Sequence, residues 1–308
     1  FISNTILVLR TAPMTFTMNK IQMELEGKYL GSLRDSNELL SDHKALRQRM
    51  EEDGYLLIRR LHDIQNVQAT RKFLLEKLHQ NQQIDGSYPL SKGVAADGKR
   101  GMFMGGNKSI THHPAFLNLV ESREIMDFYQ HYFGGEVMTY DYKWLRVVGP
   151  GNFTGAHYDI VYMGRGTPNV LTCWTPIGDI PLKMGPLAIL VGSHRFEHMK
   201  ETYGQMDVDR DHVTGWFSNN PIELVNQHGG QWQTSSFKMG DVLIFSMFTM
   251  HASLDNMTSR FRLSTDTRYQ RADEPVDERW VGKDPKAHYA WMKGETIPME
   301  KMRKQWEV

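Results

Sequence analysis

The sequence predicts a mainly β fold, a sandwich or barrel, with helices flanking the β core. The first observation is a series of short β-branched or aromatic runs, separated by Gly, Pro, Asn and Asp, in the second half of the chain. The second is that helical patterns precede these runs. The third is an apolar fraction of 40% over 308 residues, which is enough for one large core. We therefore expect helices first, then an antiparallel β core, then a packed tail.

Helical patterns dominate the first part of the chain. The expected elements are, in order, a helix over residues 41–53, a strand over 55–61, a helix over 63–82, a long loop over 82–108 and a helix over 121–133. Ser41 or Asp42 can cap the first helix, and Gly54 can end it. The loop is rich in Gly, Ser and Asp, and loops of this length are often functional.

The β core is expected from about residue 136. Its strands carry the runs EVMTYDYKWLRVV, AHYDIVY, VLTCWTPI, PLAILVG, DVLIFSMF and RFRLSTDTRY. Residues 195–235 interrupt this pattern with polar and aromatic residues, so we expect an insertion there, and a helix is expected over 288–308. The single cysteine, Cys173, lies in an apolar run and is predicted to be a packed core residue.

These patterns predict one domain preceded by a short leader. The expected segments are a disordered leader over 1–20, a single domain over 21–308, helical support over 21–135, the β core over 136–270 with its insertion at about 195–235, and a C-terminal extension over 271–308.

Composition bounds the class of partner. Lys+Arg and Asp+Glu both total 36, so no excess charge favours nucleic acid or an anionic membrane as the main partner. No run reaches the ~18 apolar residues of a membrane-spanning helix. With one cysteine, no secretory pattern and no peroxisomal signal in the terminal WEV, we expect a cytoplasmic protein.

A candidate metal site combines His157, Asp159 and His251. His157 and Asp159 are two residues apart in a run expected to be a strand, so their side chains share a face. Two histidines and one carboxylate form the facial triad that suits non-haem iron(II). His251 follows a strand-like run and can supply the third ligand.

An anion site is expected close to this triad. Arg262 lies eleven residues beyond His251, and its guanidinium can bind a carboxylate with a bidentate fork. Ser253 shares the strand face of His251 and can donate to the same carboxylate.

The strings GAHYD, CWTPIGD, GPLAILVGSH, MGDVLIFSMFTMHASLDN and RFRLSTDTRY resemble the phytanoyl-CoA dioxygenase family, over about residues 40–270. The resemblance implies a double-stranded β-helix of the jelly-roll or cupin-like type. It also implies iron(II) held by His157, Asp159 and His251, with O2 as oxidant and ascorbate as a possible reductant. The 5-carboxylate of the cosubstrate 2-oxoglutarate would bind Arg262 and Ser253, and Trp174 would line that site.

The resemblance further implies a dioxygenase that hydroxylates an unactivated C–H bond of a small or medium-sized organic substrate and releases succinate and CO2. Related halogenases replace the ligand carboxylate with a small residue, which opens a position for chloride. Because Asp159 supplies that carboxylate here, hydroxylation is favoured over halogenation.

The substrate pocket is less sharply defined by the sequence. Tyr142, Trp144 and Arg146 alternate along one strand and so form either a packing face or a pocket wall. Lys143 would lie on the opposite face and could meet an anionic group. Arg165, in the Gly-rich run YMGRGT, could contact a polar substrate from a flexible loop.

Two other classes of function remain open at this point. A non-catalytic β-barrel could bind a metal or small ligand without oxidising it, because a fold does not fix a function. An intact Arg262 argues against this reading, because a simple metal binder needs no anchor for a distal carboxylate. A cupin-type isomerase or hydrolase is also possible, although such sites usually hold more histidines than the two in register here.

Overall fold

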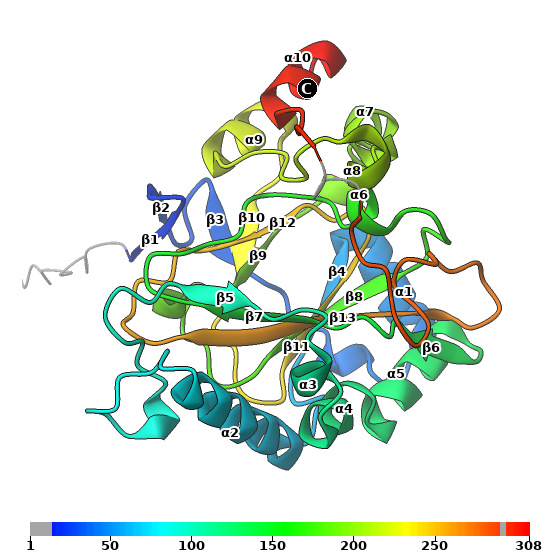
Figure 1. Cartoon of the computed structure of the whole chain (residues 1–308). Helices are drawn as coiled ribbons and strands as arrows, with labels where there is room; N and C mark the ends of the chain where they lie inside the picture. Colours follow the sequence, from blue (N-terminus) through cyan, green and yellow to red (C-terminus); the bar gives the residue numbers. More distant parts are fainter. Residues whose placement is uncertain (1–13, 290–293) are drawn as a thin grey trace, which may run out of the picture.

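The computed structural model describes residues 14–289 and 294–308, and its largest element is a seven-stranded sheet (Figure 1). The strand order is β4-β11-β8-β13-β7-β5, with β6 also paired to β13, and every pair is antiparallel. Its strands are β4 Tyr55–Ile58, β5 Gly101–Phe103, β6 Val137–Thr139, β7 Trp144–Val148, β8 Leu171–Pro176, β11 Val242–Ser246 and β13 Arg262–Arg271.

A smaller sheet has the order β12-β9-β10-β3, in which only β10 and β3 are parallel within the described chain. Its strands are β3 Leu30–Ser32, β9 Leu187–Leu190, β10 Trp232–Thr234 and β12 His251–Ser253. Between β8 and β13 the chain passes repeatedly from one sheet to the other. This is the winding of a double-stranded β-helix, and it confirms the predicted fold class.

The two faces of the large sheet differ in chemistry. On β8 and β13, Cys173 and Tyr269 point outward into an apolar cluster with the helices, so Cys173 is the core residue that the sequence predicts. The alternate residues point inward, and two of them, Thr172 and Arg268, donate hydrogen bonds to Asp159. The polar face of the large sheet therefore lies inside the β core.

The helices of the first half of the chain, α1 to α5, cover the outer face of the large sheet (Figure 1). The helices are α1 His43–Asp53, α2 Ile64–Gln80, α3 Lys108–Thr111, α4 Pro114–Val120, α5 Arg123–Phe133, α6 Ile160–Met163, α7 Glu197–Glu201, α8 Val208–Asp211, α9 Pro221–His228 and α10 Met299–Trp306. Short 3-10 turns are η1 Asn37–Leu39, η2 Leu90–Lys92, η3 Leu182–Met184, η4 Ser193–Arg195 and η5 Tyr203–Gln205. The predicted start and end of α1 are confirmed, because the Asp42 side chain accepts from Lys44 and Ala45 and Gly54 adopts the left-handed conformation.

Three expected elements differ in extent. The strand expected over 55–61 ends at Ile58, because Arg60 takes a positive φ of 58° and turns the chain. The run expected as one strand from residue 136 is split into β6 and β7 by a bend at residues 141–142. The long loop over 82–108 contains β5, which pairs with β7.

The ends of the chain and the insertion also differ from expectation. The segment 195–235 folds as short helices followed by β10, and β10 belongs to the smaller sheet. Residues 1–13 of the expected leader lie outside the described residues, whereas β1 Thr15–Met18 pairs with β2 Ile21–Glu24. Of the helix expected over 288–308, only α10 is present, and residues 290–293 lie outside the described part.

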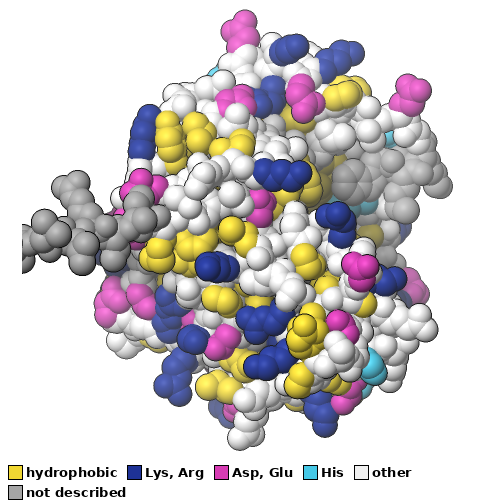
Figure 2. Space-filling view, turned by 90° about the vertical axis from the view of Figure 1, so that its left-hand side faces the viewer, with side chains coloured by type: hydrophobic (Ala, Val, Ile, Leu, Met, Phe, Trp, Pro, Cys, Tyr) yellow, Lys and Arg dark blue, Asp and Glu magenta, His cyan; other side chains and the backbone are white. Residues whose placement is uncertain are grey.

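The surface carries mixed charge. On the face shown in Figure 2, basic and acidic side chains are interspersed with hydrophobic ones. No helix in the described part of the chain has both the length and the apolar run that crossing a bilayer requires.

Candidate metal centre

The three predicted ligands meet inside the β core. Asp159 Oδ1 lies 3.8 Å from His157 Nε2 and 3.7 Å from His251 Nε2, and all three side chains are buried. Within the described ranges, this is the one group of three such side chains close enough to hold a metal ion, with ligand atoms within 4.8 Å of one another. The structure thus brings together residues that are up to 94 positions apart (251 − 157).

The backbone conformation that brings the side chains of His157 and Asp159 to the site is not the expected strand. His157 forms a single β-bridge with His251, but the chain then leaves the extended conformation, and Asp159, with φ −71° and ψ −27°, begins α6. The expectation of a regular strand through both residues is therefore wrong. A bridge followed by a helical turn places both side chains at the site.

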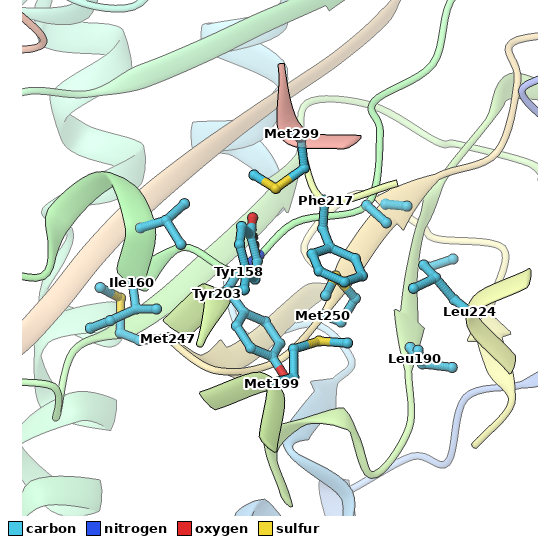
Figure 3. Close-up of a cluster of buried hydrophobic side chains, with 14 of the residues drawn as sticks. Tyr158, Ile160, Leu190, Met199, Tyr203, Phe217, Leu224, Met247, Met250 and Met299 are labelled. Carbon is cyan, nitrogen blue, oxygen red and sulfur yellow. Dashed lines mark hydrogen bonds between the residues drawn. The ribbon is translucent and has the colours of Figure 1, made fainter. Parts of the chain in front are cut away.

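Tyr158 anchors the segment between the two ligands. Its side chain points away from the site into a cluster of buried side chains, where it packs near Tyr203 and Met250 (Figure 3). The Tyr158 hydroxyl donates to the Ser193 carbonyl at 2.6 Å. Fixing this residue fixes the backbone on both sides, so the ligands are positioned by the hydrophobic core behind them.

Hydrogen bonds to the backbone set which histidine nitrogen faces the site. His157 Nδ1 lies 2.8 Å from the Gly155 carbonyl and His251 Nδ1 lies 3.0 Å from the Thr249 carbonyl. A carbonyl accepts only from N–H, so the proton is on Nδ1 and the lone pair of each Nε2 is directed at the site. This is the tautomer that a metal needs.

The second oxygen of Asp159 is held by two side chains that the sequence analysis did not predict. Oδ2 accepts from Thr172 Oγ1 at 2.5 Å and from Arg268 Nη2 at 3.0 Å, and the Arg268 guanidinium lies 4.1 Å from the centre of the Trp144 ring. Oδ1 is left facing the two imidazoles. The signal for Arg268 was available, since it follows Arg262 at even spacing along β13 and shares its inward face.

Electrostatics prepare all three ligands in the form that binds metal. Burial raises the pKa of Asp159, but Arg268, His251 and His157 together lower it by more. The pKa of Asp159 is therefore well below its ordinary value. Burial lowers the pKa of His157 well below its usual range, with a further lowering from His251. Burial also lowers the pKa of His251. At neutral pH the set is one carboxylate and two neutral imidazoles, which suits a divalent iron.

A cavity of about 230 Å³ opens on the metal centre. The predicted pocket residues Tyr142, Trp144 and Arg146 line it, together with Phe103, His157, Asp159, Tyr162, Met163, Trp216, Arg268 and His288. Phe103 comes from the 82–108 loop and Trp216 from the 195–235 segment. His288, on the C-terminal extension, carried no signal in the sequence because its neighbours in the cavity are far away along the chain.

Two other sequence predictions concern charged side chains near this cavity. Arg165 is not among the residues that line it, because its Nε pairs with Asp207 Oδ2 at 2.7 Å and its Nη1 donates to the Tyr289 hydroxyl. Lys143 is buried and meets the Glu121 carboxylate at 2.9 Å. Both cations are therefore paired with acidic residues of the chain itself.

A second polar site lies deeper between β8 and β13. Arg262 is fully buried beside Trp174, with 6.0 Å from its guanidinium carbon to the ring centre, and its Nη1 donates to the Gly185 carbonyl at 2.5 Å. Arg262 Nε, Trp174 Nε1 and Ser264 Oγ are buried atoms without a hydrogen-bond partner among the described residues. Buried polar groups are seldom left unpaired, so this cluster is suited to an anion that accepts from it.

Ser253, unlike these unpaired groups, already takes part in a hydrogen bond. Its Oγ accepts from the Thr154 N–H at 2.8 Å, which leaves its own hydroxyl proton free to be donated. Ser264, which the sequence reasoning missed, is two residues from Arg262 on the same inward face. The donor set for an anion thus comprises a guanidinium, an indole N–H and hydroxyls, all suited to a carboxylate.

Comparison with known proteins agrees with this geometry. The family model described as Phytanoyl-CoA dioxygenase (PhyH) matches residues 50–264. No match is found among curated protein sequences.

Solved structures share the fold at low identity. The α-ketoglutarate-dependent epimerase SnoN of nogalamycin biosynthesis is 17% identical, covering 84% of this chain and 98% of that chain with a TM-score of 0.55. The carbocyclase SnoK of the same biosynthesis is 19% identical, covering 78% and 86% with a TM-score of 0.54. EctD from S. alaskensis is 18% identical, covering 87% and 92% with a TM-score of 0.56.

Proposed function

The chain belongs to the phytanoyl-CoA dioxygenase family of iron- and 2-oxoglutarate-dependent oxygenases, and from this premise we propose that it hydroxylates a C–H bond of a small or medium-sized organic substrate. The observation that carries the proposal is the pairing of two sites inside one β core. One is the His157, Asp159 and His251 cluster, and the other is the set of unpaired donors around Arg262. A metal-binding module without chemistry would need only the first.

Each cofactor has residues that fit it. His157, Asp159 and His251 would hold iron(II) on one side and leave its remaining positions for ligands. Arg262, with Trp174 and Ser253 close by in the fold, would bind the 5-carboxylate of 2-oxoglutarate. Together these cofactors supply the oxidising power, because O2 is reduced while 2-oxoglutarate loses CO2 and becomes succinate.

The chain's own part is to position and to protect. Thr172 and Arg268 hold Oδ2 of Asp159, so that Oδ1 faces the two imidazoles and would bind the metal. The aromatic walls of the cavity, including Trp144 and Tyr162, would keep water away from the reacting C–H bond and hold the substrate next to the metal site.

Asp159 also bears on the outcome of the reaction. Its carboxylate fills the position that a halide would need, so transfer of oxygen is favoured over transfer of chloride. The solved relatives include an epimerase and a carbocyclase, which is why the product has to be tested directly.

Uncoupled turnover provides the first test of this function. Purified protein with iron(II), ascorbate and O2 should release CO2 from 2-oxoglutarate labelled at C1, at a low rate that rises with a productive substrate. Incorporation of ¹⁸O from ¹⁸O2 into that substrate would then identify hydroxylation.

The Asp159→Ala variant is the control, because it lacks an iron ligand and should show neither iron binding nor CO2 release. Normal activity in this variant would refute the ligand assignment. Tight metal binding with no consumption of 2-oxoglutarate would instead support a non-catalytic binding module.

A further inference from the structure

We infer that the substrate is a small monoanion whose carboxylate is bound by Arg146 in the wall of the cavity. This inference rests on the proposed function and specifies its substrate class. Arg146 lies on β7, on the face that points into the core, and lines the cavity that opens on the metal centre. Its side chain is 26% exposed, whereas Arg262 and Arg268 are fully buried.

The guanidinium of Arg146 is fixed at one end and open at the other. Its Nε donates to Asp266 Oδ2 at 2.5 Å, and among the described residues this is its one hydrogen bond. By contrast, Arg268 uses both of its Nη atoms, on the Asp266 carbonyl and on Asp159. Arg146 is therefore a held cation that presents two unpaired Nη groups to the cavity, the geometry that binds a carboxylate in a bidentate fork.

The balance of charge in the core favours an anionic guest. Three inward-facing arginines, Arg146, Arg262 and Arg268, stand against two inward-facing carboxylates, Asp159 and Asp266. Iron(II) and the dianion 2-oxoglutarate would cancel each other, so one positive charge would remain. An uncompensated cation in a desolvated site is costly, and a substrate with one negative charge would neutralise it.

The buried charge cluster around Arg279 does not neutralise this remaining positive charge. Arg279 is buried among Asp207, Asp209 and Asp277, and none of these four lines the cavity. His288 contacts this cluster and does line the cavity. Its Nδ1 lies 3.2 Å from Asp209 Oδ2, and burial lowers its pKa. His288 is therefore neutral at pH 7 and leaves the balance unchanged.

Size and lining define the rest of the molecule. The volume of about 230 Å³ is below the range of roughly 300–1,000 Å³ typical of sites for drug-sized ligands. The walls around Arg146 are aromatic, with Phe103 at 5.7 Å from its guanidinium carbon and Tyr142 stacked edge-on against Trp144. These features favour a compact carboxylic acid with an apolar body over a bulky acyl thioester.

The carboxylate bound by Arg146 could instead belong to 2-oxoglutarate, because the cosubstrate itself carries two carboxylates. Arg146 lies opposite Ser264 in the pairing of β7 with β13, only two residues along from Arg262, so the cosubstrate could reach it. The test must therefore separate loss of substrate binding from loss of 2-oxoglutarate binding.

The experiment uses full-length protein loaded anaerobically with iron(II) and 2-oxoglutarate. The probes are acetate and cyclohexanecarboxylate, each compared with its neutral amide at equal ionic strength. Binding is followed by the visible band of the iron–2-oxoglutarate chelate and by the fluorescence of Trp144 and Trp216, which line the cavity. We expect each acid to bind about tenfold more tightly than its amide, as a charge-assisted hydrogen bond would give.

Variants then assign the preference to a residue. Arg146→Gln should lose the preference for the acids while keeping the chelate band, and Arg100→Gln, an exposed arginine outside the cavity, should keep both. Because Arg146→Gln leaves the Asp266 carboxylate without its cation, Arg146→Lys is the second variant. It keeps the charge and should lose several-fold of the preference because it lacks the fork.

Each result distinguishes the hypotheses. Equal binding of acids and amides, or no binding of either acid, overturns the inference while a normal chelate band leaves the proposed function standing. Loss of the band in Arg146→Gln also overturns it, because the anion is then 2-oxoglutarate. Absence of the band in the unaltered protein counts against the proposed function itself, and the tryptophan signal of the metal-loaded protein still reports on the acids.

Discussion

Asp159 divides its two carboxylate oxygens between two tasks. Oδ2 accepts from Thr172 and Arg268, while Oδ1 faces His157 and His251. The histidines are arranged in the same way, with one ring nitrogen on a backbone carbonyl and the other at the site. At the scale of single residues, the metal centre thus depends on groups that never touch the metal.

Thr172→Val tests this dependence on a supporting residue. The change keeps the shape of the side chain but removes the hydroxyl that donates to Asp159 at 2.5 Å. Loss of such a supporting hydrogen bond typically weakens metal affinity by about 10–100-fold, and we expect an effect in this range. Competition with a metal chelator measures it. Thr172→Ser, which keeps the hydroxyl, should stay close to the unaltered protein, and an equally weak Ser variant would argue against this role.

His62 should make the stability of the metal-free protein depend on pH. Burial lowers its pKa from an ordinary 6.5 to about 4, and its Nε2 is 3.1 Å from Thr175 Oγ1. Below pH 6.5 the unfolded chain takes up a proton at His62 that the folded protein does not. The free energy of unfolding should therefore fall by on the order of 3 kcal/mol between about pH 6.5 and about pH 4 through this group.

Urea unfolding at several pH values measures this contribution. His62→Gln should remove the His62 share of the dependence and so make it distinctly shallower in that window, whereas His79→Gln, at an exposed position on α2, should leave it as it is. If both variants retain the full dependence, His62 is not its source.

Helices α1 and α5 both end at a glycine in the left-handed conformation. α1 stops at Gly54, where φ is +80° and a Cβ would lie 2.4 Å from His194 Nδ1. α5 stops at Gly134, where φ is +69° but nothing lies within 4 Å of such a Cβ. The same left-handed ending therefore carries an additional steric requirement in α1, because His194 packs against it and its Nε2–H donates to the Glu51 carbonyl at 2.8 Å.

A matched pair of variants separates backbone strain from this close approach. Gly134→Ala should cost about 1 kcal/mol of unfolding free energy, from strain in the left-handed region alone. Gly54→Ala should cost distinctly more, because His194 must also move. Urea unfolding compares the two, and equal losses would show that the contact with His194 has no energetic weight.

Over the whole molecule, the sequence was most informative where chemistry and local pattern coincide. The triad was found because His157 and Asp159 are neighbours and because His251 ends a strand-like run. The helix over 41–53, with Ser41 or Asp42 as its cap, and the helix over 121–133 were likewise expected, and α1 and α5 are present. These signals depend only on residues close together along the chain.

What the sequence did not predict depends on pairing between distant strands. Arg268 and Thr172 reach Asp159 because β8 and β13 pair in one register, and no local pattern fixes that register. His288 and Trp216 enter the cavity from segments whose course over the core follows from packing. The pairing of Arg165 with Asp207 could not be predicted either, because the Gly-rich run around Arg165 gives no sign of an acidic partner 42 residues away.

The central claim is that an iron site and a separate 2-oxoglutarate site act together in one β core. The most direct test is an anaerobic titration of iron(II)-loaded protein with 2-oxoglutarate, followed by the visible charge-transfer band of the chelate. We expect the band to appear, and Arg262→Gln to weaken it severely while the iron content stays the same. If iron binds and no band appears, or if Arg262→Gln titrates like the unaltered protein, the two-site account is contradicted.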